Sequence, residues 1–167
     1  MSVKVGDTIP DATFIEVPYS PELESLGACG MPVPAQLHKE LKGKKAVIIA
    51  IPGAFTPTCH VNHIPAFIKQ ANEFKTKGYE VYIIAANDAF VMSAFGRVSG
   101  AKEGVHFAND SGLALSQALG ATVDLTARGM GVRTGRYALI VDDLKITHFA
   151  NEPNPGEVTV SGADAVL

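Results

Sequence analysis

The stretch AVIIAIPGAFTPTCH, residues 46–60, decides how the rest of the sequence is interpreted. Its first six residues are apolar without alternation, which is typical of a strand that is buried on both faces of a sheet. Two prolines and a glycine follow, so the strand must end there and the chain must turn. Cys59 comes directly after these residues, and we predict that it lies in the first turn of a helix.

The start of a helix is a favourable place for a reactive thiol. The first backbone N–H groups of a helix have no partner within the helix, and they form the positive end of its dipole. Both effects favour the thiolate, which is the nucleophilic form of cysteine. Thr56 can bring a hydroxyl group to the same pocket. Cys59 could equally be a small buried residue at a turn, and its position alone leaves both interpretations open.

The segments on either side of this stretch predict an α/β fold. Apolar residues recur at spacings of three and four from Cys59 to Phe74, which indicates an amphipathic helix that Pro65 should kink and Gly78 should end. Further strands are expected at residues 79–86, 106–108, 136–141 and 145–149, and further helices at residues 88–96, 111–119 and 163–167. This order predicts a central mixed β-sheet flanked by helices, as in a thioredoxin-like fold, in a single domain spanning residues 1–167.

The segment of residues 16–36 is rich in proline, glycine and serine and carries the second cysteine, Cys29. We predict a long irregular arm here. A stretch of this length without regular structure is usually functional or mobile inside a compact domain.

Composition limits the possible functions. The net charge is −3, which gives no electrostatic reason to expect a nucleic acid or an anionic membrane as partner. No apolar run approaches the ~20 residues that span a bilayer. Two cysteines are too few for a disulfide scaffold or a four-cysteine zinc site. We therefore expect a cytoplasmic protein, with a peroxisomal or mitochondrial location as alternatives that no clear signal supports.

Pro52, Thr56 and Cys59 match the Pro-x-x-x-Thr-x-x-Cys motif of the peroxiredoxins. The letters PGAFTPTC resemble the type II, peroxiredoxin-5-like group. Within this group the sequence is most similar to fungal members that carry their second cysteine near the N-terminus. Four further segments in the same order support this resemblance over nearly the whole chain: VGDTIPDATF (5–14), HIPAFI (63–68), NDAFVMSAFG (87–96) and GRYALIVDD (135–143).

The resemblance implies a thiol-specific peroxidase that reduces hydrogen peroxide and alkyl hydroperoxides. Cys59 would attack the peroxide O–O bond and become a sulfenic acid, while Pro52 shields the sulfur and Thr56 contributes its hydroxyl. The family also uses an arginine, which Arg136 matches because it directly precedes the aromatic residue of RYALIV. Arg133 is the second candidate. The other two arginines considered are expected to be surface charges, namely Arg97 and Arg128.

The resemblance leaves open how the sulfenic acid is resolved. Val160 and Ile83 stand where animal and plant relatives carry their second cysteine, so Cys29 is the remaining partner. We expect a disulfide between Cys59 and Cys29, first between the two chains of a homodimer, or else direct reduction of Cys59 by an external thiol. The reductant would be thioredoxin or glutaredoxin with glutathione. A redox sensor or relay that passes oxidation to a partner protein is the alternative function.

Other signals in the sequence are weaker. The resemblance implies a dimer that packs through the segment containing Phe90 and Phe95. These two residues could equally belong to the core. His60 and His63 are expected at the surface or the pocket edge, and without further ligands nearby Cys59 and His63 predict no metal site. The glycine-rich stretch at residues 129–135 is not a dinucleotide fingerprint, so no cofactor is expected.

Overall fold

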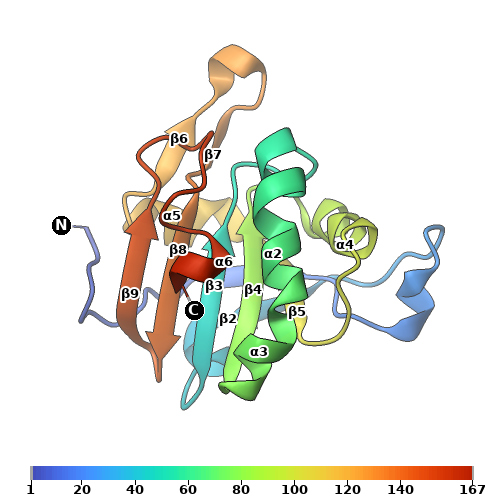
Figure 1. Ribbon diagram of the computed structural model, residues 1–167, viewed down its shortest axis with the longest axis horizontal. Helices are drawn as coiled ribbons and strands as arrows, with labels where there is room; N and C mark the ends of the chain where they lie inside the picture. Colours follow the sequence, from blue (N-terminus) through green and yellow to red (C-terminus); the bar gives the residue numbers. More distant parts are fainter. Residues whose placement is uncertain (1, 167) are drawn as a thin grey trace.

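The computed structural model describes residues 2–166, and most of its strands form one mixed sheet (Figure 1). The strand order is β2-β1-β5-β4-β3-β8-β9. The three central strands β5, β4 and β3 are parallel, and the outer pairs are antiparallel. The strands are β1 (Thr13–Glu16), β2 (Val33–Gln36), β3 (Lys45–Ala50), β4 (Tyr79–Ala85), β5 (Val105–Asp110), β8 (Tyr137–Asp142) and β9 (Lys145–Asn151). The predicted mixed sheet is therefore confirmed.

Helices cover both faces of the sheet (Figure 1). One face carries α2 (Ile64–Lys69), α3 (Ala71–Thr76), α4 (Ala89–Val98) and α6 (Ala163–Val166), and the other carries α1 (Leu37–Glu40) and α5 (Ala114–Ala118). Short helical turns lie between them: η1 (Pro21–Glu24), η2 (Thr58–His63), η3 (Ser111–Leu113) and η4 (Thr126–Arg128). A small hairpin of β6 (Thr122–Asp124) and β7 (Val132–Thr134) forms a separate sheet. The predicted last helix extended to residue 167, which lies outside the described residues.

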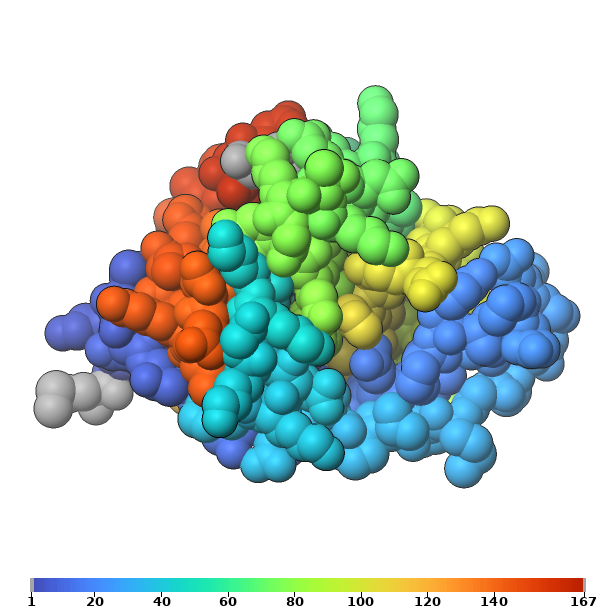
Figure 2. All heavy atoms as spheres, turned by 90° about the horizontal axis from the view of Figure 1, so that it is seen from below, coloured from blue at the N-terminus to red at the C-terminus, as the bar shows by residue number. Residues whose placement is uncertain are grey.

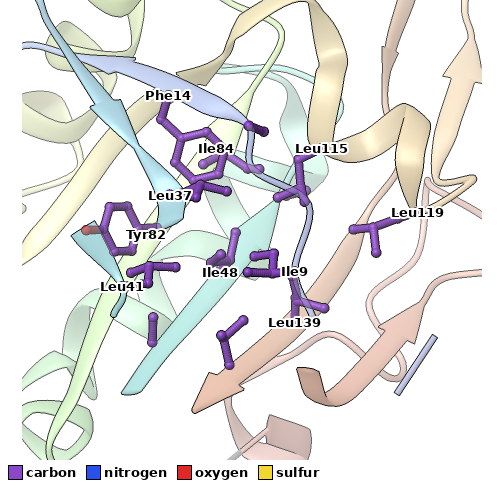
Figure 3. Close-up of a cluster of buried hydrophobic side chains, with 14 of the residues drawn as sticks. Ile9, Phe14, Leu37, Leu41, Ile48, Tyr82, Ile84, Leu115, Leu119 and Leu139 are labelled. Atoms are coloured by element: carbon purple, nitrogen blue, oxygen red, sulfur yellow. The ribbon is translucent and has the colours of Figure 1, made fainter. Parts of the chain in front are cut away.

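The continuous apolar run of β3 is explained by two cores. Successive residues of a strand point to opposite faces, so Val47 and Ile49 enter one core and Ile48 enters the other. Figure 3 shows the core around Ile48, which packs with side chains of β4 and with Leu115 of α5. Both faces of β3 are buried, as predicted, and the end of this strand is therefore a rigid base for the turn that follows.

The helix after Cys59 differs from the prediction. Instead of one kinked helix, the chain forms the π-helix η2, then α2, and then α3 after a break at Gln70. The amide of Ile64 bonds to the carbonyl of Cys59, five residues back. Pro65 has no N–H to donate, so it is tolerated in the first turn of α2 after this wide turn. Gly78 does end the helical region, with a φ of +83°.

Two other predictions need correction, and a third is confirmed. The arm is irregular only over residues 17–32, because β1 and β2 pair at its two ends and η1 lies within it. We use the name "arm" for residues 17–32 from here on. The helix expected at residues 111–119 is interrupted at Gly112 and Leu113, which both have a positive φ. The predicted hairpin around residue 143 is confirmed, with Asp143 and Leu144 both at a positive φ, as a type I′ turn requires.

Candidate active site

Cys59 lies in the first turn of η2, and none of its surface is exposed. The turn that leads to it is fixed to the rest of the molecule at the end of β3. The Thr134 hydroxyl donates to the carbonyl oxygen of Ile51 at 2.6 Å, and the amide of Ala54 donates to Asn87 Oδ1 at 2.9 Å. These contacts hold the strand-to-helix turn, so the sulfur has a defined position in the core beneath it.

Arg136 provides the positive charge of the site. It stands directly before β8, which pairs with β3, and only 2% of its surface is exposed. Its Nη2 donates to Cys59 Sγ at 3.0 Å. Its Nε donates to the carbonyl oxygen of Pro155 at 2.8 Å. The arginine that the sequence singled out is thus the one that contacts the sulfur.

His63 accepts the third contact of this guanidinium. Arg136 Nη1 lies 2.9 Å from His63 Nδ1, and His63 Nε2 lies 2.9 Å from the carbonyl oxygen of Ser161. A carbonyl can only accept, so Nε2 carries the proton and Nδ1 is the acceptor. Burial, together with the nearby Arg136 charge, lowers the pKa of His63 to about 4 despite the Ser161 carbonyl. The ring is therefore neutral at pH 7, and the charge of Arg136 is not offset by this partner.

The expectation that His63 lies at the surface or pocket edge was wrong, since its side chain is completely buried. A signal was present in the sequence, because positions 59 and 63 are four apart and face the same side of a helical segment. Among the described residues, no carboxylate forms an ion pair with Arg136. The cationic side chain is instead surrounded by a sulfur, an imidazole nitrogen and a carbonyl.

Glu152 organises the segment that covers Arg136 and His63. It is buried, and its carboxylate accepts hydrogen bonds from the amides of Thr159, Val160 and Ser161 and from the hydroxyls of Thr159 and Ser161, at 2.6–2.9 Å. Burial alone would raise the pKa of Glu152, but these donors outweigh it and lower the pKa to about 2. Sequence reasoning missed this residue. Its carboxylate positions the Ser161 carbonyl that in turn fixes the tautomer of His63.

Thr56 and Pro52 lie in the turn, as the sequence predicts. The Thr56 hydroxyl donates to the carbonyl oxygen of Gly53 at 2.8 Å, so in this structure its proton is not directed at the sulfur. Its oxygen can still accept a hydrogen bond. A Cβ at Gly53 would lie 3.1 Å from Thr56 Cγ2 and 3.3 Å from Arg133 Nη1. Gly53 therefore permits a close approach of its neighbours.

Arg133 supports the same turn from the other side. Its Nε donates to the carbonyl oxygen of Met130 at 2.7 Å, and its Nη1 lies 3.4 Å from the carbonyl oxygen of Pro52 and 3.5 Å from Asn87 Oδ1. Pro52 itself is buried. Arg133 thus contacts the turn, whereas Arg136 contacts the sulfur, and the structure separates the two candidate arginines in this way.

An aromatic cluster borders the site. Phe95 is fully buried, and its ring centroid lies 5.1 Å from that of Phe55 and 5.7 Å from that of His60. Phe55 is 48% exposed and Phe90 is 55% exposed. The core interpretation therefore holds for Phe95, while Phe90 is left at the surface.

Cys29 is not brought to this site. Both cysteines are free thiols, and Cys29 is exposed on the arm while Cys59 is buried. In Figure 1 the arm lies beyond α4, which stands between it and α2. A disulfide requires the two Cα atoms to come within ~7 Å, so a bond between these residues requires movement or a second chain.

Within residues 2–166 no group of three or more histidine, cysteine or acidic side chains is arranged to hold a metal ion. The helices of the same residues are all too short or too polar to cross a membrane. The glycine-rich residues 129–135 run from the end of η4 through β7 in the small sheet.

A buried cysteine at a strand-to-helix turn, held against an arginine that directly precedes a neighbouring strand, defines a thioredoxin-like thiol enzyme. The Redoxin family model matches residues 4–167. A Malassezia furfur protein named "Putative peroxiredoxin" is 51% identical over 98% of both chains, and Arabidopsis thaliana Peroxiredoxin-2B is 40% identical over 99% of this chain and 96% of its own.

Solved structures of peroxiredoxins are also similar to this chain. Reduced Prx3 of Vibrio vulnificus, determined in complex with H2O2, superposes with a TM-score of 0.84 at 34% identity, covering 98% of this chain and 96% of its own. Peroxiredoxin 5 of Alvinella pompejana superposes with a TM-score of 0.73 at 32% identity and 90% coverage of both chains. The chain therefore belongs to the Redoxin family and is a type II, peroxiredoxin-5-like peroxiredoxin, a thiol-dependent peroxidase. The predicted thioredoxin-like fold and enzyme class are thereby confirmed.

Proposed function

We propose that Cys59 is the peroxidatic cysteine and that Arg136 is the group that activates it. The observation that supports this most directly is the 3.0 Å contact between Arg136 Nη2 and Cys59 Sγ inside a fully buried site. A guanidinium at this distance is a charged donor aimed at the sulfur, and in a buried site its electrostatic effect is stronger than in solution.

The proposed reaction is a displacement at oxygen. The Cys59 thiolate attacks one oxygen of hydrogen peroxide or an alkyl hydroperoxide, the O–O bond breaks, and the leaving oxygen takes up a proton to become water or an alcohol. Sulfur is oxidised to a sulfenic acid. Arg136 stabilises the negative charge that spreads over sulfur and both oxygens, the Thr56 oxygen accepts a hydrogen bond from the O–H of the peroxide, and Pro52 shields the sulfur.

Cys29 is proposed to resolve the sulfenic acid. Its exposure makes it available to a second chain, so an intersubunit disulfide in a homodimer is the first choice, and the exposed Phe90 is available to such an interface. Thioredoxin or glutaredoxin with glutathione would then reduce the disulfide. We propose a cytoplasmic location, although one relative, from Lipomyces kononenkoae, is named as peroxisomal.

Two matched variants test the roles of the cysteines. Cys59→Ser should abolish peroxide consumption, because the variant has no nucleophile in the site. Cys29→Ser should still form the sulfenic acid from one equivalent of peroxide but should lose the disulfide-linked dimer on a non-reducing gel. A Cys59→Ser protein that keeps a tenth of the wild-type turnover would refute the assignment of the nucleophile.

A further inference from the structure

Arg97 holds the arm that carries Cys29. Its Nη1 donates to three carbonyl oxygens of the arm, those of Leu23, Ser25 and Ala28, at 3.2, 3.0 and 2.9 Å. An NH2 group has two hydrogens, so three carbonyls share them around one positive charge. The expectation that Arg97 is a plain surface charge was therefore wrong. One end of this contact is the residue directly before Cys29.

The remaining contacts of the arm are few. Val17 and Leu23 form a small apolar cluster with Ala89 of α4. A Cβ at Gly30 would lie 2.3 Å from Val17 Cγ1, so the backbone after Cys29 packs closely there. Glu24 is bonded by the Tyr19 hydroxyl at 2.6 Å and by Lys102 at 3.5 Å, both at exposed positions where such contacts contribute little.

A cavity lies between the arm and the rest of the molecule. It has a volume of about 230 Å³ and is bounded by Val17 and Leu23 on the arm side and by Arg97 and Phe107 on the other. The arm therefore packs on the rest of the molecule through Val17 and Leu23 and borders an open cavity beside them. Figure 2 shows the arm in blue at one side of the molecule, with the yellow segment near residue 100 between it and the green helices α2 and α3. Detaching the arm would break the three contacts of Arg97 and would also expose Val17 and Leu23, so Arg97 is its main polar attachment.

We infer that Arg97 is a positioning residue for Cys29: it clamps the arm to α4 in the reduced protein, and release of this clamp sets the rate at which Cys29 reaches oxidised Cys59. The inference rests on the proposed role of Cys29 as resolving thiol. In that step the Cys29 thiolate attacks Sγ of the Cys59 sulfenic acid. The S–S bond forms, the S–O bond breaks, and the departing hydroxide takes up a proton to give water.

The test compares the two oxidation steps in the same protein. Reduced protein receives one equivalent of hydrogen peroxide, is quenched at intervals, and is analysed for sulfenic acid, disulfide and sulfinic acid by mass spectrometry. Arg97→Met removes the guanidinium but keeps an apolar stem of similar bulk. We expect the disulfide to form about tenfold faster in this variant, since a tenfold change corresponds to loss of one charge-assisted hydrogen bond from the closed state. Less sulfinic acid should accumulate under excess peroxide.

Two further variants make the result specific. Arg97→Lys keeps the charge on a side chain one bond shorter, so it should restore the slow rate in part. Arg128→Met removes the same charge from an exposed position on η4 and should leave both steps at the wild-type rate. Hydrogen exchange of the amides of residues 23–30 in the reduced protein should be faster in Arg97→Met than in Arg128→Met.

The outcomes separate the clamp from the proposed function. A wild-type protein that forms no disulfide would refute the role of Cys29 and with it this inference. A disulfide that forms at the same rate in wild type and Arg97→Met, or more slowly in the variant, would refute the clamp alone and leave Cys29 as resolving thiol.

Discussion

Replacement of Arg136 is the most direct test of how the site activates its thiol. Arg136→Met keeps an apolar stem but removes the donors to Cys59 Sγ, to His63 and to the carbonyl oxygen of Pro155, which lie at 3.0, 2.9 and 2.8 Å. Arg136→Lys keeps the charge, but one ammonium on a shorter stem cannot contact all three groups at once.

The expected magnitude follows from the buried contact to sulfur. Loss of one preorganised donor at such a site costs ~3 to 4 kcal/mol of transition-state stabilisation, which is about 100- to 1000-fold in rate. Arg136→Met should show this full loss in the second-order rate constant with hydrogen peroxide. Arg136→Lys should lose about 10- to 100-fold, because it retains the charge without the fixed geometry.

The assay is competition for peroxide against a heme peroxidase of known rate, since the chain has no tryptophan to report oxidation by fluorescence. Arg133→Met is the matched control, because its guanidinium contacts Pro52 and not the sulfur, and it should lose about tenfold or less. Circular dichroism should confirm that each variant is folded. If folded Arg136→Met reacted within fivefold of wild type while Arg133→Met lost more, the assignment of the activating arginine would be wrong.

Two predictions concern the acid side of the stability profile. The pKa of His63 is about 4 in the folded protein and about 6.5 in the unfolded chain. The contribution of neutral His63 to the free energy of unfolding is therefore complete above pH 6.5 and is lost as the pH falls toward 4. Urea denaturation should show that wild type loses about 2 kcal/mol more stability than His63→Gln between pH 7 and pH 4.5. Equal slopes for the two proteins would mean that the pKa of His63 is the same in the folded and the unfolded protein. Glu152, whose folded pKa is about 2, contributes stability that is present above about pH 4.5 and lost below it, and Glu152→Gln should reduce the free energy of unfolding at pH 7 by about 2 kcal/mol. The same variant should also slow the reaction with peroxide, and an unchanged rate would show that the Ser161 carbonyl needs no support from Glu152.

The fold could be predicted where a segment carries its own pattern. The run of β3 is buried on both faces, and the hairpin of β8 and β9 has the turn residues that such a connection needs. The strands β1 and β2 were missed because each has four residues at or near the sheet edge, and β2 contains Pro34.

The candidate site could likewise be predicted in part. Pro52, Thr56 and Cys59 are close in sequence, so the motif itself indicates that they lie near one another in the structure. The burial of His63 depends on the Ser161 carbonyl, 98 residues away, and the fixing of the arm depends on Arg97, which lies 69 to 74 residues from its three acceptors. Such contacts leave no periodic signal, because they arise only when the tertiary structure is complete.

The absence of a carboxylate partner for Arg136 among residues 2–166 gives the proposed reaction a built-in consequence. While Cys59 is a thiolate, sulfur and guanidinium neutralise each other inside the core. The sulfenic acid is uncharged, so the first oxidation step leaves the buried guanidinium without an anionic group in direct contact, and loss of such a partner costs several kcal/mol in a protein interior. Oxidation of Cys59 would thus loosen the segment around it. The oxidised site would then open toward the resolving thiol, because the attraction between the sulfur and the Arg136 guanidinium has been lost.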